Sequence, residues 1–169
     1  MYLKSKLLRD ISKSALDYLI RDLKFVDYGN RMHALVGITP FCYKFSTVKS
    51  KHLFCHSAPR TALPIMNLAS LALKGHPLAD LLNFSHCVVT TYRHGQHVGK
   101  HADDDAMCVH DGILSISFGA RATVIIDGSP FNVVHGDALL FCGSREHEVK
   151  PVRGEWRYNF SFRSWNTSL

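Results

Sequence analysis

The chain has 169 residues, 46% of them hydrophobic and 20% charged, and a net charge of +6 with its eleven histidines neutral. This length suits one domain with a single core, and the composition excludes a disordered, fibrous or repeat protein. No stretch resembles a signal peptide or a membrane span, and the five cysteines form no C-x-x-C pair, so we expect a soluble intracellular protein with reduced thiols. The basic charge favours a polyanionic partner, nucleic acid before membrane, although a merely basic protein fits it equally well.

Two helices are expected in the first half of the chain. Residues 3–24 carry apolar side chains at a 3.6-residue period, with a cap or break near residues 12–14. The second helix is predicted over residues 64–74, since a proline opens this segment and a glycine follows it. Between them, residues 28–60 mix aromatic runs with Gly, Pro and Ser, which indicates one or two short strands and an exposed basic loop around residues 49–52.

From residue 84 onward the pattern is that of strands. Seven short segments with turn residues between them recur about every ten residues: HCVVTTYR, GILSISFG, ATVIID, FNVVHG, DALLFCG, HEVKPV and WRYNFSFRSW. Regular short strands favour a β-sandwich or barrel. We therefore expect an N-terminal helical layer packed on a C-terminal β-core.

The segment HADD contains a candidate metal site. In a strand, His101 and Asp103 point to the same face, which supplies two of the three ligands of a 2-His-1-carboxylate iron site. Alone, H-x-D is a weak signal, because a surface histidine beside solvated aspartates is commoner. His97 and His101 also have the i, i+4 spacing of a helical zinc motif, but the glycines around them and the lack of a following Glu make that interpretation weak.

The segment WRYNFSFRSW predicts a strand with one polar and one aromatic face. Arg157, Asn159, Ser161 and Arg163 share the polar face. A solvated face would explain them, but near the end of the chain and between two tryptophans an enclosed strand is favoured, with guanidinium groups that grip carboxylates. The Cα atoms of the two arginines would lie roughly 20 Å apart, at opposite ends of a site.

Three histidines, His110, His135 and His147, are candidates for a third metal ligand. His135 lies in an expected turn and is interpreted as structural or exposed. His147 opens a short strand ten residues before Arg157, and a hairpin would place the two side by side. Connectivity therefore favours His147.

These motifs together resemble the AlkB-type Fe(II)/2-oxoglutarate dioxygenases. The resemblance covers residues 84–163. It includes the closing motif, which usually reads R-x-N-x-T-x-R in the family, and the leading motif N-x-Y-x-x-G-x-x-x-x-x-H-x-D, although Thr90 stands where the family has Asn. The matching positions are Tyr92, Gly95, His101, Asp103, His147, Arg157, Asn159, Ser161 and Arg163. Compact AlkB-like domains of plant RNA viruses are similar in size.

The resemblance implies an α+β fold with a double-stranded β-helix (jelly-roll) core and N-terminal helices packed on one sheet. Residues 1–169 would form one dioxygenase domain, with 1–83 as helical support and nucleotide-recognition region and 84–169 as the core. It also implies Fe(II) and 2-oxoglutarate as cofactor and co-substrate. The implied metal ligands are His101, Asp103 and His147, and the implied co-substrate residues are Tyr92, Arg157, Asn159 and Arg163.

The implied reaction is oxidative demethylation of bases such as 1-methyladenine and 3-methylcytosine, with release of succinate, carbon dioxide and formaldehyde. The partner would be methylated single-stranded RNA or DNA, RNA being favoured, and we expect a monomer. Asp105 matches a family position that contacts the base and is the candidate catalytic residue, while Tyr43 and Phe45 are candidates for stacking on a flipped base. Two alternatives are a 2-oxoglutarate oxygenase that hydroxylates a protein or small molecule, and a catalytically silent β-sandwich that binds nucleic acid.

Overall fold

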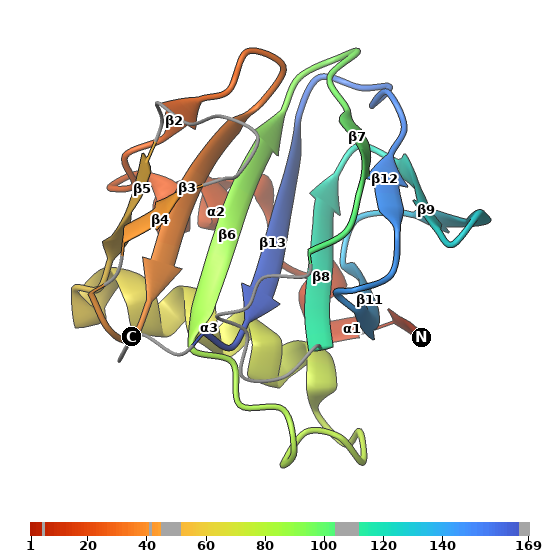
Figure 1. Ribbon diagram of the computed structural model, residues 1–169. Coiled ribbons are helices and arrows are strands. Elements are labelled where there is room, and N and C mark those ends of the chain that lie inside the picture. The colour runs from red at the N-terminus through yellow and green to blue at the C-terminus, as the bar shows by residue number, and fades with distance from the viewer. Residues whose placement is uncertain (5, 41, 45–51, 104–111, 166–169) are drawn as a thin grey trace.

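The computed structural model describes residues 1–4, 6–40, 42–44, 52–103 and 112–165, and it shows two sheets that face each other, with helices outside the larger one (Figure 1). The larger sheet, hereafter the major sheet, has the strand order β1-β11-β8-β13-β6-β3-β5-β4, with β2 paired to β3. Adjacent strands in this sheet are antiparallel, except for β3 and β5, which are parallel. Its strands are β1 (Tyr2–Lys4), β2 (Val26–Asp27), β3 (Met32–Gly37), β4 (Cys42–Lys44), β5 (His52–His56), β6 (His86–Tyr92), β8 (Gly112–Gly119), β11 (Asp137–Cys142) and β13 (Arg157–Arg163).

The smaller sheet, hereafter the minor sheet, has the order β10-β9-β12-β7. Its strands are β7 (Val98–His101), β9 (Ala122–Ile126), β10 (Ser129–Val133) and β12 (His147–Val149). The β9–β10 hairpin turns at Asp127 and Gly128, which both have positive φ, as the type I′ turn of an Asp-Gly hairpin requires. The turn residues expected between these two segments are thus confirmed.

The outer face of the major sheet carries most of the core. Helices α1 (Lys6–Arg9), α2 (Lys13–Ile20) and α3 (Pro59–Leu73) lie on that side (Figure 1). Buried residues of α3, including Ile65 and Leu68, pack with Phe160 and Phe162 of β13 in one cluster. The alternation of β13 thus places its aromatic face against the helices, and its polar face is turned toward the minor sheet.

The expected fold class is confirmed: the protein is α+β, with two mostly antiparallel, unclosed sheets and helices on one of them. Residues 28–56 contribute β3, β4 and β5 to the major sheet, so the first half of the chain supplies more strands than predicted. None of the helices among the described residues is long and apolar enough to cross a membrane.

The single helix predicted over residues 3–24 is wrong at both ends. Residues 2–4 form an edge strand paired with β11. Three residues are too few for a hydrophobic period to distinguish a strand from a helix. The predicted cap near residue 12 is confirmed, since the Ser12 hydroxyl accepts a hydrogen bond from the Ala15 amide at 3.2 Å. The helix that follows ends at Ile20.

The second helix begins five residues before its predicted start. Pro59 takes the first helical position, and Pro64 lies inside the helix. Two prolines in one segment offered two starts, and the earlier one is used. The missing N–H of Pro64 faces the carbonyl of Arg60, an exposed residue in the first turn, where water can take its place.

Candidate metal and co-substrate site

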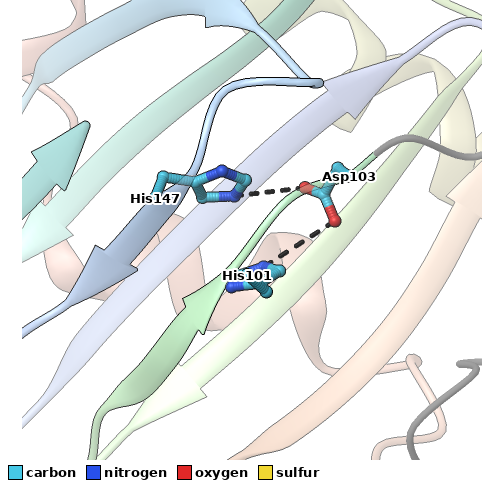
Figure 2. Close-up of side chains that lie close together, drawn as sticks. All are labelled: His101, Asp103 and His147. Atoms are coloured by element: carbon cyan, nitrogen blue, oxygen red, sulfur yellow. Dashed lines mark ion pairs between the residues drawn. The ribbon is translucent and has the colours of Figure 1, made fainter. Parts of the chain in front are cut away.

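Three side chains with metal-ligand chemistry converge between the two sheets. His101 ends β7 and His147 begins β12, and the two are direct partners in the antiparallel pairing of these strands. Asp103 follows β7, and its backbone N–H donates to the Gly143 carbonyl at 2.8 Å. The ligand atoms of the three residues all lie within 4.8 Å of one another (Figure 2).

Both imidazoles are held in the same way. The ring Nδ1 of His101 lies 2.8 Å from the Gly99 carbonyl, and that of His147 lies 2.9 Å from the Arg145 carbonyl. Because a carbonyl only accepts, each Nδ1 carries the proton and each Nε2 offers its lone pair. The two Nε2 atoms lie 3.7 and 3.3 Å from the carboxylate oxygens of Asp103 (Figure 2). Two nitrogens and one carboxylate are the donor set of a facial-triad Fe(II) site, so the residues fit this metal.

Asp103 is held as a carboxylate. Its side chain is only 10% exposed, and the Nη2 atom of Arg163 lies 2.5 Å from the Oδ2 atom of Asp103. Burial alone would raise the pKa of Asp103, but the charge of Arg163 and the hydrogen bond and charge of His147 outweigh it and lower the pKa below its usual value. Burial lowers the pKa of His101, which favours the neutral imidazole that a metal requires.

The polar face of β13 forms the second part of the site. Arg157 is fully buried, and its Nη2 donates to the Ser117 hydroxyl at 2.8 Å. Its guanidinium carbon lies 5.2 Å from the centre of the Tyr92 ring. The Nε and Nη1 atoms have no hydrogen-bond partner among the described residues. A buried guanidinium with free donors fits the far carboxylate of a dicarboxylate such as 2-oxoglutarate.

Asn159 lies between the two arginines and is fixed by serines. Its amide nitrogen donates to the Ser161 hydroxyl at 2.9 Å, and its oxygen accepts from Ser115 at 2.9 Å. Arg163, at the other end of the strand, contacts Asp103 rather than Asn159. The two arginines therefore serve opposite ends of the polar face, as their spacing predicts.

The structure brings seven of the predicted site residues to the space between the sheets and leaves three undetermined. The seven are His101, Asp103, His147, Tyr92, Arg157, Asn159 and Arg163. Tyr43 lies in β4 opposite Leu53, in a part of the strand whose side chains are not described. Phe45, Asp105 and the alternative ligand His110 lie outside the described residues.

The structure decides three interpretations of the histidines, of which the first is wrong. His147 does not lie beside Arg157 in a hairpin, because β12 belongs to the minor sheet and β13 to the major sheet. His135 is structural: its ring accepts from the Gly119 amide and lies 2.9 Å from the Ile11 carbonyl. His97 is exposed and precedes a strand, so the helical zinc motif is absent.

Sequence reasoning missed several polar residues that line the site. Ser115 and Ser117 alternate within the otherwise apolar strand β8, and this alternation was a readable signal. His33 of β3 was also missed, and its Nδ1 lies 2.9 Å from the hydroxyl of Thr90. Its place depends on the pairing of β3 with β6, which no local pattern indicates.

Comparison with known proteins agrees with this arrangement. No family model matches the chain. It is 25% identical to the alpha-ketoglutarate-dependent dioxygenase AlkB of Salmonella typhimurium in an alignment of 192 residues that covers 92% of this chain and 88% of that protein.

Two solved structures have a similar fold. That of OsALKBH1 superimposes with a TM-score of 0.63 at 17% identity and covers 96% of both chains. An oxidoreductase of the 2OG-Fe(II) oxygenase family from Burkholderia pseudomallei gives a TM-score of 0.61 at 13% identity and covers 91% of this chain and 78% of that one. The chain is thus AlkB-like in sequence, its fold is similar to those of these two solved structures, and its described residues include a His-Asp-His cluster.

Proposed function

We propose that the chain is an Fe(II)- and 2-oxoglutarate-dependent dioxygenase that removes methyl groups from N-alkylated bases of nucleic acid, with RNA favoured over DNA. The observation that carries the proposal is the convergence of two imidazole Nε2 atoms and one carboxylate within 4.8 Å. This cluster shares the space between the sheets with a buried, partly unpaired guanidinium.

His101, Asp103 and His147 would hold Fe(II). The backbone carbonyls of Gly99 and Arg145 fix both imidazoles with Nε2 turned to the metal, so little rotamer entropy is lost when the metal binds. Arg163 keeps Asp103 ionised and oriented. Bound Fe(II) and 2-oxoglutarate would supply the oxidation of an N-methyl group by dioxygen, which yields succinate, carbon dioxide and, after loss of the hydroxylated methyl group, formaldehyde.

Arg157 and Tyr92 would bind the far carboxylate of 2-oxoglutarate. Both are almost fully buried, so the pair would form in a site from which water is excluded. Asn159 and Arg163 would lie toward the metal-bound end. This arrangement selects a dicarboxylate, because a 2-oxo acid without the far carboxylate would leave the Arg157 charge unpaired.

A nucleic-acid substrate is supported by charge and by the similarity to AlkB. The net charge is +6 with the histidines neutral, and the exposed Arg93 lies at the start of the turn that leads into β7 and His101. Asp105, Tyr43 and Phe45 are the proposed contacts to the methylated base. The short nucleotide-recognition region favours single strands, in which no duplex must be opened.

The test is a panel of single-stranded RNA and DNA oligonucleotides that carry 1-methyladenine or 3-methylcytosine. The full chain is incubated with Fe(II), 2-oxoglutarate and ascorbate, and mass spectrometry follows the loss of the methyl mass. We expect His101→Ala and His147→Ala to abolish turnover, while the exposed control His97→Ala stays active.

Two outcomes separate the parts of the proposal. Succinate release without demethylation of any oligonucleotide would leave an oxygenase and refute the nucleic-acid substrate. Equal activity of His97→Ala, His101→Ala and the unmodified chain would refute the metal site.

A further inference from the structure

A row of polar side chains crosses four strands of the major sheet on the face turned toward the metal cluster. His33 of β3 is paired with Thr90 of β6, Thr90 with Asn159 of β13, and Asn159 with Ser117 of β8. Directly paired residues point to the same side of a sheet. All four are buried, with 3–8% of their surface exposed. Polar side chains this deep need hydrogen-bond partners, and the direction of their bonds determines what they can still donate.

In the hydrogen bonds that link Arg31 to His33 and His33 to Thr90, the donor and the acceptor can be assigned. Arg31 Nε donates to His33 Nε2 at 2.9 Å, and a guanidinium can only donate. His33 Nε2 is therefore an acceptor, and its proton is on Nδ1, which lies 2.9 Å from the Thr90 hydroxyl oxygen. Burial, followed by the charges of Arg31, Arg163 and His101, lowers the pKa of His33 to about 3, which keeps the ring neutral. Thr90 thus accepts from His33, and its own hydroxyl proton is left to point elsewhere.

Arg31 is itself fixed from two directions. Its Nη1 donates to the Asn30 side-chain oxygen at 2.8 Å and reaches the His97 carbonyl at 3.5 Å. The Asn30 amide also donates to the His97 carbonyl, at 3.2 Å. The turn before β7 therefore holds Arg31, the first residue in this series of hydrogen bonds, in place.

We propose that the Thr90 hydroxyl donates a hydrogen bond to an oxygen of the bound 2-oxo acid, and that Arg31 and His33 are positioning residues that turn the hydroxyl toward it. The inference rests on the proposed function, since the ligand is its co-substrate. Thr90 lies beside Asn159 on the polar face, between the levels of Arg157 and Arg163. A side-chain amide at this position could donate without help, whereas a hydroxyl rotates and needs a donor behind it. The His33 bond supplies that donor and polarises the hydroxyl.

The first test compares three variants of the full chain loaded with Mn(II), which permits binding without turnover. Affinity for radiolabelled 2-oxoglutarate is measured by equilibrium dialysis. Thr90→Val keeps the shape and deletes the hydroxyl, so we expect binding about tenfold weaker, equivalent to about 1.4 kcal/mol. Thr90→Ser restores the hydroxyl and should bind within about twofold of the unmodified chain. Thr91→Val is the matched control, because Thr91 is paired with Tyr158 on the opposite face.

The second test separates positioning from packing. The His33 ring packs edge-on against the Tyr28 ring, with 5.1 Å between the ring centres. His33→Phe keeps a ring at this position but has no N–H group to donate to Thr90. We expect His33→Phe alone to weaken 2-oxoglutarate binding about threefold to fivefold. The double variant should lose no more than Thr90→Val alone, because both changes break the same series of hydrogen bonds. Mn(II) affinity should be unchanged in all variants, since the metal ligands lie on β7 and β12.

The two proposals fail in different ways. If the unmodified protein binds 2-oxoglutarate, and Thr90→Val and His33→Phe both bind it as tightly as the unmodified protein, the proposed role of Thr90, His33 and Arg31 is refuted. The proposed oxygenase function then still stands. If Thr90→Val does not fold, unchanged affinity of His33→Phe alone refutes the proposed role of these residues. If the unmodified chain with Mn(II) binds no 2-oxoglutarate, the proposed function fails and this inference fails with it. A visible charge-transfer absorption of the anaerobic Fe(II) complex that shifts in Thr90→Val, but not in Thr91→Val, would place the hydroxyl at the chelating end.

Discussion

Arg157 is a buried cation with no carboxylate beside it among the described residues. The Ser117 hydroxyl, the Asn159 oxygen and the face of the Tyr92 ring are its contacts, and two of its nitrogens lack a partner there. Burial lowers the pKa of this guanidinium, and Tyr92 only partly offsets the effect. Taking a charge out of water is costly unless a counter-ion compensates. The fold therefore carries a cost at Arg157 that a bound anion would remove.

Replacing this charge should separate stability from binding. We expect Arg157→Met, without ligand, to be as stable as the unmodified chain or more stable by about 1–3 kcal/mol, because an apolar side chain of similar length replaces a poorly paired ion. The melting-temperature rise with Mn(II) and 2-oxoglutarate should be lost in this variant. Arg153→Met, at an exposed position, is the control and should keep that rise. A destabilised Arg157→Met that still responds to 2-oxoglutarate would contradict this account.

At the scale of the elements, the end of β8 shows how closely the strands pack around Arg157. Gly119, the last residue of β8, is paired with Arg157 and has a φ of 88°. A Cβ atom placed there would lie 2.6 Å from the Trp156 ring and from its backbone oxygen. The Ala120 amide also donates to that oxygen, at 2.9 Å. The approach of β8 to the start of β13 therefore requires glycine.

Two glycine variants isolate the steric part of this requirement. Gly119→Ala and Gly128→Ala both place alanine at positive φ, which costs about 1 kcal/mol. Only Gly119→Ala also collides with neighbouring atoms, since nothing lies within 4 Å of a Cβ at Gly128. We expect Gly119→Ala to lose at least about 2 kcal/mol more than Gly128→Ala in urea unfolding. Equal losses would mean that Trp156 moves aside without cost.

The strands and helices also show which features local sequence patterns can predict and which they cannot. The period-two alternation of β13 predicted both of its faces correctly, because one strand contains the whole signal. Connectivity put His147 in a hairpin with Arg157, and this prediction was wrong because the order of strands along the chain does not reveal which sheet each strand joins. The start of α3 was missed for a similar reason, since Pro59 and Pro64 are equivalent as local signals.

At the scale of the whole molecule, the candidate site is assembled from three distant parts of the sequence. The metal cluster comes from the minor sheet, the arginines come from β13, and His33 comes from β3 in the first half of the chain. The sequence motifs singled out the residues of the first two groups as candidates. The third was not predictable, because His33 reaches the site only through the pairing of β3 with β6, which joins residues 57 positions apart. Strand pairing between distant segments can be seen in the structure but not in the local sequence pattern.

The same burial of histidines governs the response of the whole molecule to acid. Burial is the first cause of a lowered pKa at His33, His56 and His86, and it brings that of His33 to about 3. In the unfolded chain these imidazoles return to a pKa of about 6.5, so below that pH the unfolded state binds more protons than the folded state. The stability that depends on these neutral imidazoles is therefore fully present above about pH 6.5 and falls as the pH decreases. For His33 the loss is about 1.4 kcal/mol per pH unit.

Urea unfolding at a series of pH values tests this dependence. For His33 the loss should continue from about pH 6.5 down to about pH 3, since the folded-state pKa sets the lower limit. His33→Phe removes one titrating group, and we expect its stability to fall less steeply, by about 1.4 kcal/mol per pH unit. Thr90→Val is the matched control, because it breaks the same hydrogen bond but keeps the buried imidazole, whose neutrality comes first from burial, and it should keep the steep slope. Identical slopes for His33→Phe and the unmodified chain would show that His33 takes up a proton without unfolding the protein.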